Sequence, residues 1–232
     1  MKNSGFSWQK SLTKAICLST LLVHGTGFAA SYSAKVRDKN GGALGDAVVT
    51  LHLLPASKAN EPAVAVNSAT TNNGNGNGVG TTLAQEGLQF ERYVTAIRVG
   101  TTVTLPNRDK LEHHIKSLGP SQMFELKIYE PGANRAIVFD KPGPSVLICY
   151  LHGWMRAWVF AADTPFFGKT GAEGEVRIDD LKPGDYEMRV WHPDTLSPFQ
   201  AIRVSLREEA LSQKIATEVM PRKRKVNPNS GK

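Results

Sequence analysis

The chain has 232 residues, of which 41% are hydrophobic, and its formal net charge is +7 at pH 7. Three positive residues lie within the first 14 positions and five follow residue 221, so the body between them is close to neutral. A neutral body and a basic cluster without interleaved aromatic residues argue against nucleic-acid binding. The length suffices for one large or two small β domains.

Residues 1–29 are expected to form a cleaved secretory signal peptide. Three lysines precede an apolar run that closes on small residues, which favours cleavage after Ala29 or Ala30. The run is shorter than a membrane span and contains a histidine and two glycines, which disfavours the alternative of a membrane anchor. We therefore expect a periplasmic protein without a transmembrane span after cleavage.

Cleavage would remove Cys17 and leave Cys149 as the lone cysteine of the mature chain. Exported thiols are normally oxidised to pairs, so a lone one needs protection. Burial as a small apolar residue would provide it, and so would a metal ion that holds the thiolate.

The rest of the chain predicts an all-β fold, because short alternating apolar runs bounded by Gly, Pro, Asn and Asp recur throughout. Only residues 207–220 fit a helix. The Asn/Gly-rich run within residues 61–80 cannot pack a core and reads as a flexible linker. Strands are expected at residues 33–38, 46–54, 93–99, 101–107, 123–129, 135–140, 145–151, 156–163, 174–179, 185–191 and 199–206.

These strands fall into two groups. Residues 81–163 carry the histidine and cysteine elements, whereas residues 31–60 and 164–208 have the turn chemistry of another β-sandwich. The segments KVRDKNGGALGDAVVTL and TGAEGEVRIDDLKPGDYEMRVWHP together resemble the carboxypeptidase-regulatory-like, or transthyretin-like, repeat. Their separation favours an insertion of one sandwich into the other over two independent repeats or a tandem. Residues 209–232 are expected to end in a disordered basic tail, the alternative being a docking segment for anionic partners or lipid.

The stretch CYLHGWM places Cys149, His152 and Met155 three residues apart from one another. With this chain's composition, such a pattern arises by chance in roughly one chain in a thousand. The cysteine ends a predicted strand, so all three side chains come from one strand end and the loop that leaves it. Composition alone therefore does not explain the pattern.

A thiolate and two imidazoles in a trigonal plane, with a weak thioether on the axis, form the blue-copper site. Zinc is the rival metal, but structural zinc sites prefer several thiolates and a hydrolytic zinc site needs a nearby general base. No acidic residue shows such a placement. His192 has no partner at metal-ligand spacing, and we expect it to be structural, while His52 in the first strand is expected to be structural or exposed.

The second histidine is expected in PNRDKLEHHIKSLGP, residues 106–120, where His113 and His114 are adjacent. Strand alternation places His113 on one face with Ile115 and His114 on the other with Lys116. The apolar face favours His113, with His114 pointing outward or bonding the rim of the site. A register shift of one residue would exchange the two histidines.

The segments GLQFERYVTAIRVGTTVTLPNRDKLEHHIKSLG, FELKIY and VFDKPGPSVLICYLHGWMRAWVFAADTPFF resemble the cupredoxin family. The loop spacing is amicyanin-like, since the plastocyanin loop is longer, and the chain is similar to exported proteins often labelled methylamine utilization proteins. The resemblance implies a Greek-key sandwich with one mononuclear type 1 (blue) copper held by His113, Cys149, His152 and Met155. It also implies backbone hydrogen bonds to the cysteine sulfur from near Asn107 and the 149–155 loop.

Four positions depart from the usual pattern of that group, namely Arg92, Tyr150, Leu151 and Gly153. None of them is a ligand, so the departures bear on the reduction potential and the docking surface. The resemblance does not imply a methylamine pathway, because fold and site recur without their partners.

We therefore expect a periplasmic electron-transfer protein in which copper cycles between Cu(I) and Cu(II). The partner would be a cytochrome or oxidoreductase, bound through a transient interface next to Gly153 and Trp154. Trp154 and Trp158 would either shield the copper or belong to that docking patch. An enzyme is not expected, because a copper oxidase or nitrite reductase needs extra histidines for a second copper site. The alternative is a copper delivery, storage or adaptor module.

Overall fold

The computed structural model describes residues 30–55, 80–197, 199–207 and 210–228. The predicted signal peptide, most of the predicted linker and the last four residues lie outside the described residues. Among the described residues no helix is long and apolar enough to cross a membrane. The prediction of an all-β fold is confirmed for the described residues.

The strands, in chain order, are β1 (Ala30–Arg37), β2 (Val48–Leu53), β3 (Thr81–Thr82), β4 (Val94–Arg98), β5 (Thr101–Thr104), β6 (His113–Leu118), β7 (Phe124–Tyr129), β8 (Ala136–Phe139), β9 (Gly143–Cys149), β10 (Arg156–Ala162), β11 (Phe166–Lys169), β12 (Glu175–Leu181), β13 (Gly184–Trp191), β14 (Ile202–Leu206) and β15 (Leu211–Ala216).

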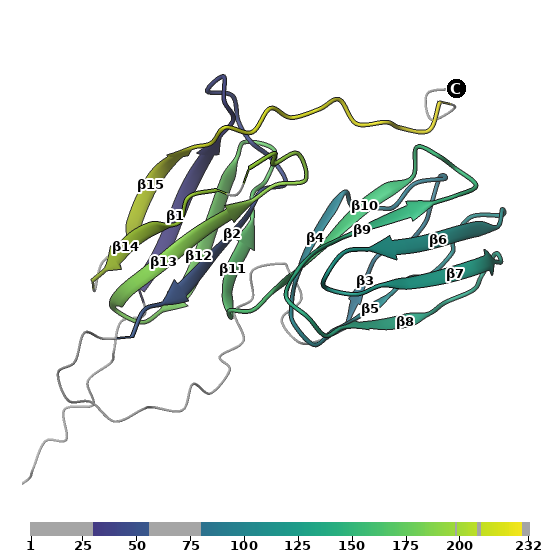
Figure 1. Ribbon diagram of the computed structural model, residues 1–232, viewed down its shortest axis with the longest axis horizontal. Coiled ribbons are helices and arrows are strands. Elements are labelled where there is room, and N and C mark those ends of the chain that lie inside the picture. Colours follow the sequence, from purple (N-terminus) through teal and green to yellow (C-terminus); the bar gives the residue numbers. More distant parts are fainter. Residues whose placement is uncertain (1–29, 56–79, 198, 208–209, 229–232) are drawn as a thin grey trace, which may run out of the picture.

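One sandwich, here called the flanking sandwich, is built from β1, β2 and β11 to β15. Its sheets have the strand orders β11-β2-β13-β14 and β12-β1-β15, and they lie on the left of Figure 1. Alternating residues of facing strands fill its core, which includes Tyr32, Leu51, Ile178 and Tyr186. Since the side chains of a strand alternate between faces, this pattern buries the inner face of each sheet in the core between them.

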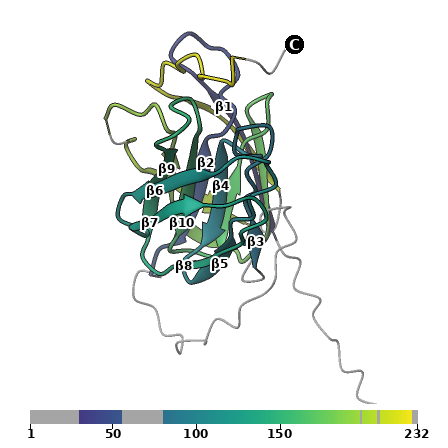
Figure 2. The same cartoon turned by 90° about the vertical axis from the view of Figure 1, so that its right-hand side faces the viewer.

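The other sandwich, here called the inserted sandwich, is built from β3 to β10. A five-stranded sheet of order β4-β10-β9-β6-β7 faces a three-stranded sheet of order β3-β5-β8, as the end-on view in Figure 2 shows. Ile115, Phe139 and Leu147 belong to its core. Alternation along β9 buries Leu147 and Cys149 on the same face.

The two sandwiches are interleaved in the chain. Both β1 and β2 pair with strands that follow the inserted sandwich: β1 with β12 and β15, and β2 with β11 and β13. In the sequence, the strands of the inserted sandwich therefore come between the two halves of the flanking sandwich, although the two sandwiches lie side by side in space. The residue boundaries given above for the domains, and the transthyretin-like identity of the flanking sandwich, stay predictions.

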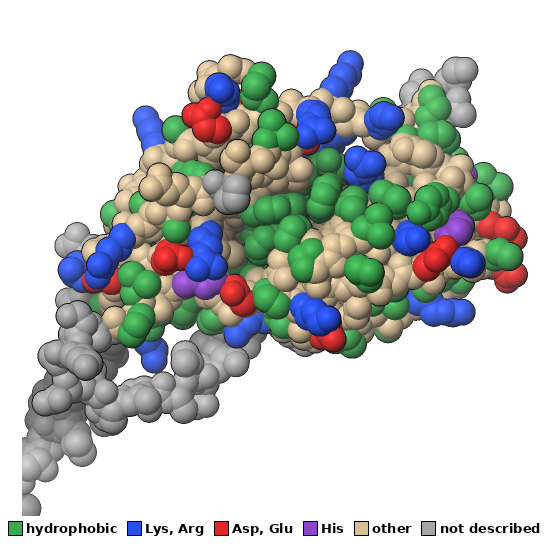
Figure 3. All heavy atoms as spheres, in the orientation of Figure 1, with side chains coloured by type: hydrophobic (Ala, Val, Ile, Leu, Met, Phe, Trp, Pro, Cys, Tyr) green, Lys and Arg blue, Asp and Glu red, His purple; other side chains and the backbone are tan. Residues whose placement is uncertain are grey.

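An apolar contact joins the sandwiches. Val94, Ala96 and Ala162 of the inserted sandwich pack with Val48 and Phe167 of the flanking sandwich. Beside it lies a cleft of about 430 Å³ lined by side chains of both, where hydrophobic side chains gather in the middle of the face in Figure 3.

Trp158 belongs to this contact between the sandwiches. Its ring centroid is 5.6 Å from that of Trp191 in β13. Neither role expected for Trp158 holds, because the residue packs against the flanking sandwich rather than around the 149–155 loop.

The segment that fits a helix in the sequence forms β15 instead. Residues 211 to 216 pair in parallel with β1, and Ile215 of this strand enters the flanking core. The tertiary pairing overrides a weak local preference, which is common for short segments.

After β15 the chain continues as an extended segment, residues 217–228, here called the C-terminal strap. Figure 1 shows it crossing the upper edge from β15 to the inserted sandwich. Arg222 pairs with Asp194, and Arg224 pairs with Asp46 while its guanidinium lies 4.1 Å from the ring centroid of Tyr93. This differs from the disordered tail expected from the sequence, because acidic residues far away in the chain bind its arginines.

Candidate metal centre

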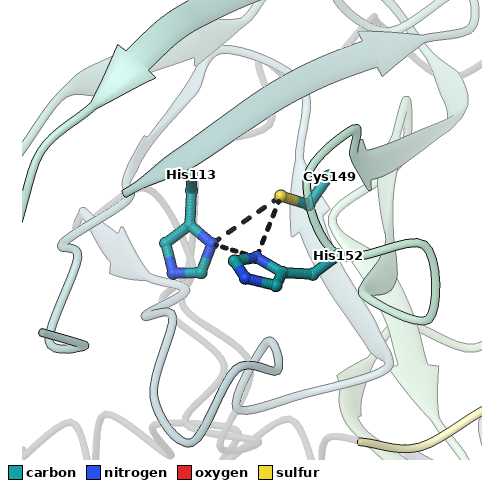
Figure 4. A group of neighbouring side chains, drawn as sticks. All are labelled: His113, Cys149 and His152. Carbon is teal, nitrogen blue, oxygen red and sulfur yellow. Dashed lines mark hydrogen bonds between the residues drawn. The ribbon is translucent and has the colours of Figure 1, made fainter. Parts of the chain in front are cut away.

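The candidate centre lies where two paired strands of the inserted sandwich end. His113 is the first residue of β6 and Cys149 the last of β9. The strands are antiparallel, with Ile115 opposite Cys149, so the end of one lies beside the start of the other. Figure 4 shows the imidazoles of His113 and His152 and the thiol of Cys149 pointing toward one another.

The loop after Cys149 folds back on itself. The backbone N–H of Met155 donates to the carbonyl of His152 at 2.8 Å, and that of Cys149 donates to the carbonyl of Met155 at 3.2 Å. These bonds bring His152 back over the strand end. Met155 is 2% exposed and belongs to the same core cluster as Cys149, while its role as a ligand stays a prediction.

Three potential ligand atoms form a compact triangle. The Sγ atom of Cys149 is 3.7 Å from Nδ1 of His113 and 3.6 Å from Nδ1 of His152, and the two nitrogens are 3.2 Å apart. A point about 2.0 Å from all three atoms lies inside this triangle, close to the bond lengths of a transition metal to nitrogen, about 2.0–2.1 Å, and to thiolate sulfur, about 2.3 Å. The donor atoms present therefore fit one ion after only a small shift of the sulfur.

The electrostatics of the cluster favour a thiolate. Burial opposes ionisation of Cys149, but hydrogen bonds from the side chain of His113, the backbone of His114 and His152 outweigh it and lower the pKa of the thiol to about 6. Burial alone would lower the pKa of His113, yet its hydrogen bonds to Cys149 and Asp109 raise it. A thiolate is the form of cysteine that binds metals.

Asp109 orients His113 from behind. Its Oδ2 atom lies 2.9 Å from Nε2 of His113, which favours a proton on Nε2 and turns Nδ1 toward the thiol. Asn107 shapes the turn that presents Asp109, since its amide donates to the carbonyls of Leu111 and Tyr129 and its Oδ1 accepts from the backbone N–H of Asp109. Asp109 was not predicted from the sequence, although its four-residue spacing to His113 was available as a signal.

His114 turns away from the cluster. Its Nε2 atom is 2.8 Å from a carboxylate oxygen of Glu125, and its ring lies against that of Tyr150. The backbone of His114 contributes a hydrogen bond to the sulfur of Cys149, whereas the backbone N–H of Asn107 donates to the carbonyl of Ala133. The expected sulfur contact near Asn107 is therefore replaced by one from β6.

The outer side of the loop reaches solvent. His152 is partly exposed, while Tyr150 and Leu151 are 54% and 56% exposed. The indole of Trp154 lies 5.6 Å from the ring of His152 and donates to the carbonyl of Leu88 at 2.9 Å. Trp154 therefore packs beside the histidine at the mouth of the site.

Neither a protein-family model nor a curated protein matches the chain. Among solved structures, it is similar to amicyanin from Paracoccus versutus, with 20% identity over 35% of this chain and 80% of that one and a TM-score of 0.33. It is also similar to a purple cupredoxin from Nitrosopumilus maritimus, with 22% identity over 35% of this chain and 99% of that one and a TM-score of 0.32.

A third similar structure is a copper-containing nitrite reductase from Thermus scotoductus, with 25% identity over 49% of this chain and 25% of that one and a TM-score of 0.35. With TM-scores this low, the case for a metal rests on the geometry of the cluster.

Proposed function

We propose that the protein is a copper-binding electron carrier. The observation that supports this most directly is the compact triangle of one thiol sulfur and two imidazole nitrogens with sides of 3.2 to 3.7 Å. One soft sulfur ligand and two imidazoles suit a single copper ion in a trigonal plane, with Met155 as the expected axial ligand.

The donor set favours copper over zinc. Structural zinc sites commonly use four strong ligands, whereas this cluster offers one thiolate and two imidazoles. The nearest carboxylate, Asp109, bonds Nε2 of His113 on the side away from the thiol. A thioether completes a copper site more readily than a zinc site.

Electron transfer is favoured by the rigidity of the ligand residues. His113 is fully buried and Cys149 is 4% exposed, and each belongs to a strand of the same hydrogen-bonded sheet. A bound copper ion would supply a one-electron change of oxidation state. Side chains held this firmly keep nearly the same positions in both states, and the partly exposed edge of His152 gives a partner access.

We further propose that the carrier acts in the periplasm and meets a redox protein through a small, transient interface around His152. Tyr150 and Leu151 directly precede that residue in the chain, and their side chains are exposed. They suit an interface with an apolar component. Small interfaces are typical of short-lived encounters between redox proteins.

The test is to purify the chain that starts at Ala30, add one equivalent of Cu(II), and record absorption and electron paramagnetic resonance spectra. We expect an intense visible thiolate-to-copper band that Cys149→Ser abolishes. His114→Ala is the matched control, because His114 is adjacent to His113 but bonds Glu125, and it should keep the band. A colourless protein with one bound copper would refute the proposal.

Voltammetry then separates a carrier from a delivery module. A carrier should give a reversible one-electron wave and retain Cu(I) in the presence of a chelator. Rapid loss of Cu(I) without a reversible wave would support delivery instead.

A further inference from the structure

A tight turn at residues 86–89 lies next to the candidate metal centre. The backbone N–H of Glu86 donates to the carbonyl of Gln89 at 2.9 Å. Gly87 and Leu88 both have positive φ, 65° and 55°, and this conformation is unfavourable for a residue such as leucine. The turn therefore needs contacts from outside to keep its shape.

The backbone of Leu88 is connected to both histidines of the triangle. Its N–H donates to both carboxylate oxygens of Asp109 at 3.2 and 3.3 Å, and that carboxylate bonds Nε2 of His113. Its carbonyl accepts from the indole of Trp154, whose ring lies beside His152. One peptide segment thus supports the group that orients His113 and the ring that packs on His152.

The C-terminal strap contacts this turn. The side-chain amide of Asn227 donates to the carbonyl of Gly87 at 3.1 Å. Asn227 is 8% exposed, whereas the preceding Val226 is 55% exposed and Lys225 is also exposed. Of residues 225–227, Asn227 is therefore the one that faces the inserted sandwich.

The flanking sandwich anchors the strap before it reaches the turn. Asp194, which follows β13, accepts from the backbone N–H of Arg222 at 2.9 Å and pairs with its guanidinium. Asp46 pairs with Arg224 and also with Lys169. A single exposed ion pair contributes little, but pairs that share residues and a backbone hydrogen bond hold an extended segment more firmly.

From these contacts we infer that Asn227 is a positioning residue of the metal centre, and that the flanking sandwich serves to present it. The inference rests on the proposed function as far as copper is concerned. Asn227 holds the 86–89 turn, the turn holds Asp109 and Trp154, and these two residues hold the histidines. The metal centre of the inserted sandwich is then supported by the C-terminal strap.

The test compares Asn227→Ala and Asn227→Asp with Lys225→Ala in the full mature chain. Asn227→Asp keeps the shape of the side chain but removes the amide donor, and Lys225→Ala changes an exposed residue two positions earlier. The first measurement, on the metal-free protein, is the rate at which the indole proton of Trp154 and the ring proton of His113 exchange with water by NMR. The second is the rate at which Cu(II) is lost to a chelator.

We expect both Asn227 variants to speed proton exchange and Cu(II) loss about three- to tenfold, less than the ten- to hundredfold typical of residues that bond a ligand directly. Lys225→Ala should change neither rate. Equal rates in all four proteins would overturn the inference, as would faster Cu(II) loss without faster proton exchange. Because the proton measurement needs no metal, a protein that binds no copper would refute the proposed function while this inference could still be confirmed or rejected.

Discussion

The two sandwiches each bury a histidine, with opposite electrostatic results. His113 of the inserted sandwich is fully buried and its pKa is raised, whereas His192 of the flanking sandwich is 4% exposed and its pKa is lowered. Burial lowers the pKa of both, but hydrogen bonds to Cys149 and Asp109 reverse the shift at His113. The difference shows that converging partners, rather than burial, distinguish a candidate site from a structural histidine.

His52 strengthens this comparison because it too has a carboxylate nearby. Its Nε2 atom is 3.6 Å from Asp163, and its pKa is nevertheless lowered, with burial the largest cause. A nearby carboxylate alone is therefore insufficient to raise the pKa of a buried histidine. The additional hydrogen bond to the thiol of Cys149 distinguishes His113 from His52.

The largest effect is expected from replacing the buried histidines. His113→Ala removes one of the three converging donors and should weaken copper binding by at least about 100-fold, since even residues behind a ligand often contribute ten- to hundredfold. His192→Ala should leave copper affinity unchanged and lower the free energy of unfolding by about 1–3 kcal/mol, because the backbone N–H of Asp194 loses its acceptor. Chelator competition and denaturant unfolding measure the two quantities. Equal copper affinities would contradict the comparison.

The next effect concerns the carboxylates. Asp109→Asn keeps an acceptor for Nε2 of His113 but removes the negative charge, and should weaken copper binding about tenfold. Asp163→Asn, made beside His52, is the matched control and should have no effect on copper affinity. The same competition titration serves for both, and a similar loss in the two variants would show that the carboxylate of Asp109 has no particular role.

A smaller effect, on the free energy of unfolding, is expected from replacing the two partly buried tryptophans of the inserted sandwich. The indole of Trp154 donates to Leu88, whereas that of Trp158 is buried with no hydrogen-bond partner among the described residues. Each Trp→Phe change removes similar apolar area, but only Trp154→Phe breaks a hydrogen bond. We expect Trp154→Phe to destabilise the protein by about 1 kcal/mol more than Trp158→Phe, as measured by urea unfolding. The reverse order would mean that the bond to Leu88 contributes nothing.

The smallest effect concerns pH. Because burial lowers the pKa of His192, the unfolded chain binds a proton that the folded protein does not once the pH falls below about 6.5. The contribution of His192 to the free energy of unfolding should therefore fall as the pH is lowered from 7.5 to 5.5. His192→Asn keeps an acceptor for Asp194 and cannot titrate, so the unmodified protein should lose stability relative to this variant over the range, while His113, whose pKa is raised, contributes equally to both. Parallel stability curves for the two proteins would contradict the assignment.

The sequence predicted the parts of the site that depend on short-range order. Cys149, His152 and Met155 lie in one loop, so their spacing alone indicated that they could converge. Alternation along one strand was enough to favour His113 over His114, and the structure places His113 at the cluster. Most strands were predicted for the same reason, since a buried face repeats every second residue.

Residues whose role depends on distant partners were not found from the sequence. Asp109 is only four residues from His113, but it reaches the ring because Asn107 closes the turn through the carbonyls of Leu111 and of Tyr129, which ends β7. The strap was predicted to be a disordered tail because the sequence does not show that Asp194 and Asp46, which are distant along the chain, bind its arginines. Likewise the segment that forms β15 was predicted to fit a helix, because its pairing with β1 joins residues at opposite ends of the described chain and cannot be seen in the local sequence.

The interleaved order of the sandwiches has a consequence for folding. While the chain is being made, β1 and β2 have no partners, because the strands that pair with them come after the whole inserted sandwich. The inserted sandwich closes mostly over shorter sequence separations, which favours its earlier formation. The edges of β1 and β2 then stay open until the second half of the chain arrives, and unpaired strand edges invite association with other chains. Newly made protein is consequently most prone to aggregate in the interval before β11 to β15 dock.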